Sequence, residues 1–243
     1  MPRVSVLMPV YNVSVYPDGW VNRALRSVIV DQSIDVELCM VDDCSTDDTQ
    51  KYIKGIGKPV WLKSGQTEKN TGGEGAVNLA AEMATGDYFI LLSCRSWYEP
   101  ESLTKMANYL DTHPEVGFVY GRTHFHNDRR ANGGEWLKTP NEFDPQDFKR
   151  FFASSFGYMY RREAWDAGMR YGCTIYIPEE DRYMTIADYH MVMNLIFKMN
   201  WKGYAMRDTT ALHYHFGGEQ MNNLLVKYKA RINEEFARLW AKE

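Results

Sequence analysis

Apolar residues in the first half of the chain fall in short continuous runs that alternate with segments of helical periodicity. Such runs are typical of strands in a sheet that is covered on both faces. The alternation predicts an α/β fold with a mostly parallel central sheet flanked by helices. The expected strands span residues 4–12, 36–41, 60–62, 88–92 and 116–121, and the expected helices span 21–32, a segment through Tyr52, 76–84 and 100–111.

The second half of the chain is less regular. Turn residues gather between positions 127 and 134, where a hairpin is expected. We expect one domain over residues 1–243. Its first half ends at about residue 120, its second half spans about 121–220, and a C-terminal amphipathic helix follows over 221–243. The other expected elements are strands at 156–160, 204–206 and 210–215, a helical turn at 161–167, an acidic loop at 177–183 and a helix from 188 to about 200.

Composition and charge exclude several classes of protein. The 28 basic and 32 acidic residues give a net charge of −4, which offers no general attraction to nucleic acid, so we expect no nucleic-acid partner. No apolar run approaches the roughly 20 residues that span a bilayer, and the first residues lack the apolar region of a signal peptide. The four cysteines form no CxxC pair, which is typical of reduced thiols. These features predict a cytoplasmic protein without a transmembrane segment.

Polar loops follow three of the expected strands. Asp42 and Asp43 follow the second strand, Asn70 and Gly72 lie in a glycine-rich loop after the third, and residues 93–96 (Ser-Cys-Arg-Ser) follow the strand at 88–92. Ligands of open α/β sheets bind beyond the carboxyl ends of the strands. We therefore expect the chemistry of this protein at these loops.

The residues after the first strand make a nicotinamide-dependent oxidoreductase a remote option. The dinucleotide fold requires G-x-G-x-x-G directly after its first strand, whereas this chain has Pro9, Val10, Tyr11 and Asn12 there. A nucleobase that stacks on Tyr11 and donates an N–H to Asp43 is physically sensible. The alternative is that the acids only cap the next helix.

The segments VSVLMPVYN at 4–12, VDDCSTDDT at 41–49 and Asn70-x-Gly72 with Asn78 resemble the amino-terminal half of family 2 glycosyltransferases. The resemblance implies the GT-A fold and a nucleoside diphosphate-sugar donor, most plausibly a UDP-sugar. It makes residues 1–120 the nucleotide-sugar-binding half and 121–220 the acceptor-binding half. The donor-binding residues that it implies are Pro9, Tyr11, Asn12, Asp42, Asp43, Asn70, Gly72, Asn78, Ser93 and Arg95.

The same resemblance assigns residues of the second half. Asp188 takes the place of the general base, although its usual glutamate neighbour is Ala187; alternatively Asp188 is only a helix cap. The carboxy-terminal histidine of the family falls on His213 or His215, and His215 is a candidate diphosphate contact. Tyr158, Arg161 and Trp165 fall on the acceptor side, with core packing and a helix start as the alternative. His124 and His126, with the same spacing as 213 and 215, are expected to face solvent.

The chain departs from the family at the D-x-D motif, whose carboxylates bind a divalent ion. Ser93 and Arg95 occupy those positions, followed by Ser96, and these residues do not make a site for a hard cation. We predict no metal ligand here and expect the Arg95 guanidinium to bind the diphosphate instead. Two alternatives stay open: a manganese or magnesium ion held by other ligands, and a non-catalytic descendant.

The resemblance as a whole implies an inverting glycosyltransferase. It would move a hexose-type sugar from a nucleoside diphosphate donor to an acceptor hydroxyl of unknown identity, without requiring a metal ion. The alternative is a nucleotide-sugar-binding or scaffolding protein without turnover.

Overall fold

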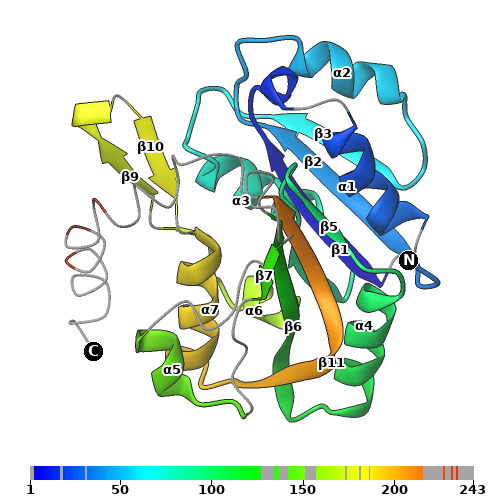
Figure 1. Ribbon diagram of the computed structural model, residues 1–243, viewed down its shortest axis with the longest axis vertical. Helices are drawn as coiled ribbons and strands as arrows, with labels where there is room; N and C mark the ends of the chain where they lie inside the picture. Colours follow the sequence, from blue (N-terminus) through cyan, green and yellow to red (C-terminus); the bar gives the residue numbers. More distant parts are fainter. Residues whose placement is uncertain are drawn as a thin grey trace.

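A computed structural model describes most of the chain and has an α/β architecture with helices on both faces of a central sheet (Figure 1). The predicted fold class is therefore confirmed. The residues described are 3–16, 19–30, 32–126, 134–136, 142–150, 157–172, 174–180, 182–185 and 187–215, together with 227, 231 and 234. The predicted C-terminal helix over 221–243 lies outside the described residues, apart from positions 227, 231 and 234.

The sheet has nine strands in the order β3-β2-β1-β4-β8-β6-β11-β5, with β7 paired to β6. The β1–β2, β2–β3, β1–β4 and β6–β11 pairs are parallel, whereas β8, β5 and β7 run antiparallel to their neighbours. The strands are β1 Val4–Val10, β2 Val36–Asp42, β3 Leu62–Gln66, β4 Tyr88–Leu91, β5 Ser96–Tyr98, β6 Val116–His126, β7 Gly134–Trp136, β8 Tyr158–Arg161 and β11 Lys202–His215.

Two apolar clusters cover the two faces of this sheet. Along β6, Phe118 and Tyr120 face one cluster and Val119 faces the other, as the period of two in a strand requires. Helices α3, α6 and α7 pack in the first cluster, and α1, α2 and α4 in the second. The helices are α1 Trp20–Ile29, α2 Thr49–Ile56, α3 Glu74–Met83, α4 Ser102–Thr112, α5 Pro145–Arg150, α6 Glu163–Asp166 and α7 Ala187–Phe197.

The structure differs from the sequence prediction at several elements. The loop expected at 177–183 is instead part of a separate hairpin, formed by β9 Thr174–Ile177, a 3-10 turn and β10 Arg182–Thr185. The two strands expected near the end are one strand, β11, with irregular pairing between Met206 and Leu212. Strand β5 was not predicted, β3 begins two residues later than expected, and α4 begins at Ser102 instead of Pro100.

The parallel strands β1, β2, β3, β4, β6 and β11 end at one edge of the sheet, here called the carboxyl edge. Both β4 and β6 run antiparallel to β8, so the two share a direction although they are not neighbours. The loops after β1, β2, β3 and β4 therefore lie along the same edge. Within the described part of the chain, no helix is both long and apolar enough to cross a bilayer.

Two glycines give a test of the packing. A methyl group on Gly117 in β6 would lie 2.4 Å from the ring of Trp201, so Gly117→Ala should destabilise the fold by about 1–3 kcal/mol through overpacking. Gly55 in α2 has no atom within 4 Å of such a methyl group, so Gly55→Ala should stabilise it by about 0.5–1 kcal/mol. Urea unfolding of both variants measures the difference, and equal effects would contradict this packing.

Candidate active site at the carboxyl edge

Asn12 joins the loops that follow β1 and β2. Its backbone is left-handed, with φ of 47°, its N–H donates to Ser45 Oγ over 2.9 Å, and its Oδ1 accepts the Thr46 N–H over 2.9 Å. Ser45 and Thr46 therefore do not cap α2, whose N-cap is Asp48. The neighbouring Tyr11 is 41% exposed, so its ring is accessible to a ligand at the carboxyl edge. Pro9 lies in β1, beside Val41 of β2.

Asp42 is fully buried at the end of β2 and holds three segments together. One carboxylate oxygen accepts the N–H and the hydroxyl of Ser45, with the N–H at 3.1 Å. The other accepts the side-chain amides of Gln50, over 2.6 Å, and Gln66, over 3.1 Å. The acid thus fixes the β2 loop against α2 and β3.

Asp43 organises the glycine-rich loop. It is 1% exposed, and its Oδ1 accepts the hydroxyls of Thr67 over 3.1 Å and Thr71 over 2.6 Å. Its Oδ2 accepts the Gly73 N–H over 2.7 Å. A hydrogen bond from a nucleobase N–H to Asp43 stays a prediction, and it would require the carboxylate to exchange one of these partners.

Two residues of the glycine-rich loop have a local reason for their identity. Asn70 Oδ1 accepts the Gly72 N–H over 2.9 Å, which closes a tight turn. Gly72 and Gly73 have φ of 72° and 93°, a region that glycine enters without steric cost. Asn70 and Gly72 therefore shape the loop, and α3 starts directly after it.

The Ser93–Ser96 turn lies at the end of β4. Ser93 O accepts the Ser96 N–H over 3.0 Å, and Ser93 Oγ accepts the Arg95 N–H over 3.3 Å. Cys94 is buried, and burial raises the pKa of its thiol to about 12. Arg95 is half-buried. The turn contains no carboxylate, and no group of three or more His, Cys, Asp or Glu gathers among the residues that the structure covers. A hard divalent ion held by carboxylates does not fit this site.

The unpredicted strand β5 brings the end of β11 to this turn. Backbone pairing sets His213 opposite Trp97 and Tyr214 opposite Ser96. His215 therefore lies, by its backbone, at the predicted edge, although its side chain is outside the described part of the structure. The prediction that His124 and His126 face solvent is wrong: both are half-buried at the end of β6, with Nδ1 of His124 2.9 Å from Nε2 of His126.

Asp188 lies in the first turn of α7 and is 8% exposed. Burial raises the pKa of its carboxyl to about 6, although hydrogen bonds from the backbone of Tyr189 and of Asp188 itself favour the charged form. Because α7 leads into β11, which starts at the opposite edge, the start of α7 points to the carboxyl edge. A carboxyl with this pKa is suited to proton transfer near neutral pH.

Tyr158, Arg161 and Trp165, which were assigned to the acceptor, make contacts within the protein. Tyr158 is buried, and its hydroxyl donates to the backbone carbonyl of Asp188. Trp165 is buried against Phe89, with the Arg170 guanidinium 3.7 Å from its ring centre. These contacts fit the alternative of core packing, and Tyr158 also holds the backbone of Asp188; a contact of Tyr158 or Trp165 with the acceptor stays a prediction.

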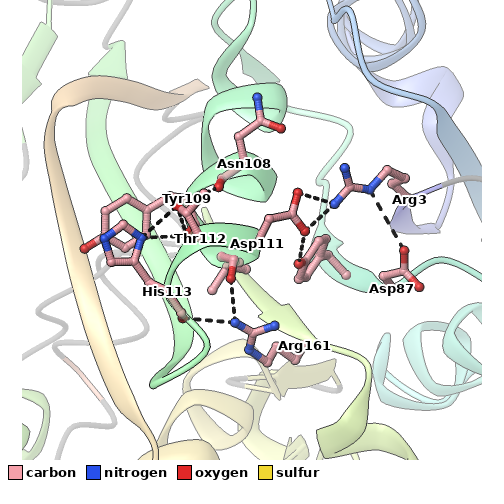
Figure 2. Close-up of polar contacts among 10 residues, drawn as sticks. Arg3, Asp87, Asn108, Tyr109, Asp111, Thr112, His113 and Arg161 are labelled. Atoms are coloured by element: carbon pink, nitrogen blue, oxygen red, sulfur yellow. Dashed lines mark hydrogen bonds and ion pairs between the residues drawn. The ribbon is translucent and has the colours of Figure 1, made fainter.

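Arg161 lies at the edge of the sheet opposite the carboxyl edge, where its guanidinium contacts His113 (Figure 2). It pairs with Tyr88, the first residue of β4. Its guanidinium donates to the carbonyls of Leu110 over 2.6 Å, His113 over 3.1 Å and Val116 over 3.0 Å. These are the last carbonyls of α4 and the loop beyond it, which a cation satisfies well.

Asn78 is bonded to the backbone of Tyr171, and its predicted contact with the donor stays a prediction. Its amide nitrogen donates to Tyr171 O over 2.9 Å, and its Oδ1 accepts the Tyr171 N–H over 3.0 Å. One turn earlier in α3, Glu74 Oε2 accepts the Thr174 N–H over 3.0 Å. These contacts join α3 to the segment that leads into the β9–β10 hairpin and Asp188. No pattern in the sequence indicated Glu74 or Tyr171. The pairs Asn78–Tyr171 and Glu74–Thr174 are separated by 93 and 100 residues along the chain.

Comparison with known proteins identifies relatives. The family model "Glycosyl transferase family 2" matches residues 5–168, more than half of the chain. An uncharacterized glycosyltransferase of Haemophilus influenzae is 32% identical over 111 residues, 45% of this chain and 43% of that protein. The poly(ribitol-phosphate) beta-N-acetylglucosaminyltransferase TarS of Staphylococcus aureus is 30% identical over 114 residues, 46% of this chain and 20% of TarS. The matched region is thus under half the length of either relative.

Solved structures share the fold. TarS residues 1–349 in complex with UDP-GlcNAc superpose with a TM-score of 0.66 at 21% identity, covering 90% of this chain and 60% of that one. Mannosyltransferase PcManGT from Pyrobaculum calidifontis, in complex with GDP-Man and Mn²⁺, gives a TM-score of 0.66 at 18% identity, covering 98% and 64%. At these identities the likeness supports the GT-A fold alone.

The raised pKa of Asp188 predicts how stability depends on pH. The pKa of the Asp188 carboxyl is about 6 in the folded state and 3.8 in the unfolded state. Ionisation of this acid therefore costs more in the folded state, and the free energy of unfolding falls as pH rises between these two values. Asp188→Asn should therefore be more stable than wild type by up to about 3 kcal/mol at about pH 8. Urea unfolding at several pH values tests this, and an advantage that persists unchanged to about pH 4 would contradict it.

Proposed function

Because this chain belongs to glycosyl transferase family 2, we propose that it transfers a sugar from a UDP-sugar to an acceptor hydroxyl with inversion at the anomeric carbon. The observation that carries the proposal is the arrangement at the carboxyl edge. The exposed ring of Tyr11, the glycine-rich loop and the Ser93–Ser96 turn lie along this edge, and the start of α7 brings the buried Asp188, whose pKa is raised, to the same edge. TarS was solved with UDP-GlcNAc, which supports a UDP-sugar as the donor to test first.

The nucleotide would lie across the ends of β1, β2 and β3. The exposed ring of Tyr11 offers a face for the base. Asp42 and Asp43 are buried acids that hold the surrounding loops in place, so their loss would distort the donor site even without a direct contact. Asn12 and Gly72 act in the same way, through the turns that they form.

The diphosphate would lie at the Ser93–Ser96 turn. In place of a metal ion, the Arg95 guanidinium would bind phosphate oxygens, because it always carries its charge and offers two parallel N–H donors. As the bond from the anomeric carbon to the phosphate oxygen breaks, negative charge develops on UDP, and a fixed cation stabilises it. His215, at the end of the neighbouring β11, is a second candidate for this contact.

Asp188 would be the general base. Its carboxylate would take the proton from the acceptor hydroxyl while that oxygen attacks the anomeric carbon from the face opposite the phosphate. The bonding electrons of the old C–O bond leave with UDP, which completes an inverting displacement. The hydrogen bond from Tyr158 to the backbone of Asp188 would hold the base in position.

One observation favours a second candidate function. The Ser93–Ser96 turn has lost both carboxylates that would recruit a metal ion, so a protein that binds a nucleotide-sugar without consuming it is the rival. Release of UDP from UDP-GlcNAc and related donors, across a panel of acceptors, separates the two. Binding without any turnover would favour the rival.

The proposed base gives a kinetic prediction. Asp188→Asn should lower the rate of UDP release by at least about 10²-fold, as loss of a general base does, while UDP affinity stays the same. The wild-type rate should rise with pH through about 6, where the Asp188 carboxyl ionises. An undiminished rate in the variant would exclude Asp188 as the base.

The proposed phosphate contact gives a binding prediction. Titration calorimetry should find similar UDP affinity for wild type with and without Mn²⁺. Arg95→Ala should weaken UDP binding roughly 10- to 100-fold, the loss expected for charge-assisted hydrogen bonds, and Arg95→Lys should lose less. Arg26→Ala, in the last turn of α1, is the control. A large gain in wild-type affinity with Mn²⁺ would refute the metal-free arrangement.

A further inference from the structure

An open cavity of about 740 Å³ lies at the edge of the sheet opposite the carboxyl edge. The parallel strands β6 and β11 begin there, and Figure 1 shows the ends of α4 and α7 beside these strand starts. Its volume is within the roughly 300–1,000 Å³ range of ligand pockets. None of the described residues assigned to the donor, the acceptor or the base lines it. We call this cavity the amino-edge groove, and the argument uses its lining residues Tyr109, Glu115, Asn200, Trp201, Lys202 and Tyr204.

A column of three stacked rings ends at the amino-edge groove. The Tyr109 ring is nearly parallel to the His113 ring, with the ring centres 3.9 Å apart, and to the Tyr204 ring, with the centres 4.2 Å apart. Figure 2 shows Tyr109 beside His113. Because two rings cannot both stack this closely on one face of Tyr109, they occupy its two faces. The column therefore ends in Tyr204, which is 42% exposed, and presents aromatic surface to a ligand.

Trp201 adds a second aromatic ring, and glycine determines its place. A methyl group on Gly117 would lie 2.4 Å from the indole, so the ring rests directly on the backbone of β6. Gly203 of β11 lies in the same way against the Phe118 ring, also at 2.4 Å. The half-buried indole is thus held by the sheet before any ligand binds, which lowers the entropic cost of binding.

Polar side chains complete the lining. Glu115, Asn200 and Lys202 are all exposed. No other described residue forms a hydrogen bond or an ion pair with these three side chains. They therefore offer free donors and acceptors to a ligand. One carboxylate and one ammonium group also give the lining no net charge.

We propose that the amino-edge groove binds a neutral glycan. A pyranose ring has an apolar C–H face and a belt of hydroxyls, each of which can donate and accept a hydrogen bond. The C–H face would pack on the rings of Tyr204 and Trp201. The hydroxyls would bond to Glu115, Asn200 and Lys202, whose side chains supply both acceptors and donors.

The mixed lining favours a glycan over other occupants. An anionic chain would meet Glu115 and a cationic chain would meet Lys202. An apolar surface of a second copy would cover both charged groups without pairing them, which is costly. A neutral polyol avoids each of these costs. The groove lies away from the donor loops, so a glycan bound there is held apart from the place of sugar transfer, and the site does not rest on the proposed reaction.

Glycan binding without any donor present tests the proposal. Cellohexaose, chitohexaose and mannohexaose are titrated into the wild-type protein by calorimetry, and a heparin hexasaccharide is the anionic comparison. We expect at least one neutral glycan to bind saturably, with an affinity that salt hardly changes, because the lining has no net charge. Added UDP should not displace it. Failure of all three to bind, or tighter binding of the heparin hexasaccharide, would overturn the proposal, whether or not the protein transfers sugar.

Variants locate the bound glycan. Tyr204→Ala should weaken binding at least about 10-fold, as loss of a central aromatic contact does, and Lys202→Ala about 2- to 10-fold through lost hydrogen bonds. Tyr176→Ala is the matched control, because Tyr176 lies in the β9–β10 hairpin with a similar exposure of 43%. Circular dichroism checks that each variant folds. Affinity lost in Tyr176→Ala but kept in Tyr204→Ala would place the glycan elsewhere and refute the site.

Tryptophan emission reports the contact directly. Glycan binding should change the emission of the wild-type protein, and Trp201→Phe should abolish that change while keeping an aromatic face for the sugar. A change that persists in Trp201→Phe would contradict the proposed contact. Sedimentation tests the rival occupant: if no glycan binds and Tyr204→Ala converts a dimer into monomers, the groove is an interface between two copies of this chain and the proposal is wrong.

Discussion

The carboxyl edge of this protein depends on two charged groups that are hidden from water. A carboxylate is costly to bury unless hydrogen-bond donors surround it, and Asp42 and Asp43 meet that requirement by drawing in donors from several segments. The donors come from the loop after β2, from α2, from the end of β3 and from the glycine-rich loop. Four stretches of chain are thereby fixed relative to one another, and the candidate donor site is the surface that they form together.

The fold could be predicted because the residues of its central strands are almost all apolar. The neighbours Val6 and Leu7 point to opposite faces and both are buried, so an apolar run of four or more residues indicates a strand without any knowledge of its partners. The three residues of β5 carry no such signal, since that strand exists only through its pairing with β11. The β9–β10 hairpin was missed because its two strands have only four residues each and mix aliphatic residues with Thr, Tyr and Arg.

The sequence predicted which loops lie at the candidate site more accurately than it predicted which atoms each side chain contacts. The loops after β1 to β4 do lie on one edge, because parallel strands leave no other arrangement. Arg161 shows the limit of that reasoning: a guanidinium near an aromatic segment looks like a ligand contact until the direction of β8 is known. Asn78 shows another limit, because its partner, the backbone of Tyr171, has no sequence signature at all.

The joint between α3 and the segment before β9 has a consequence for how such proteins diversify. Glu74 and Asn78 grip the main chain at positions 174 and 171, not the side chains there. Any residue other than proline offers the same N–H. The Tyr171 side chain is buried in the core, whereas Glu74 contacts only the backbone N–H of Thr174. Substitutions at position 174 other than to proline can therefore leave this joint between α3 and the segment before β9 intact.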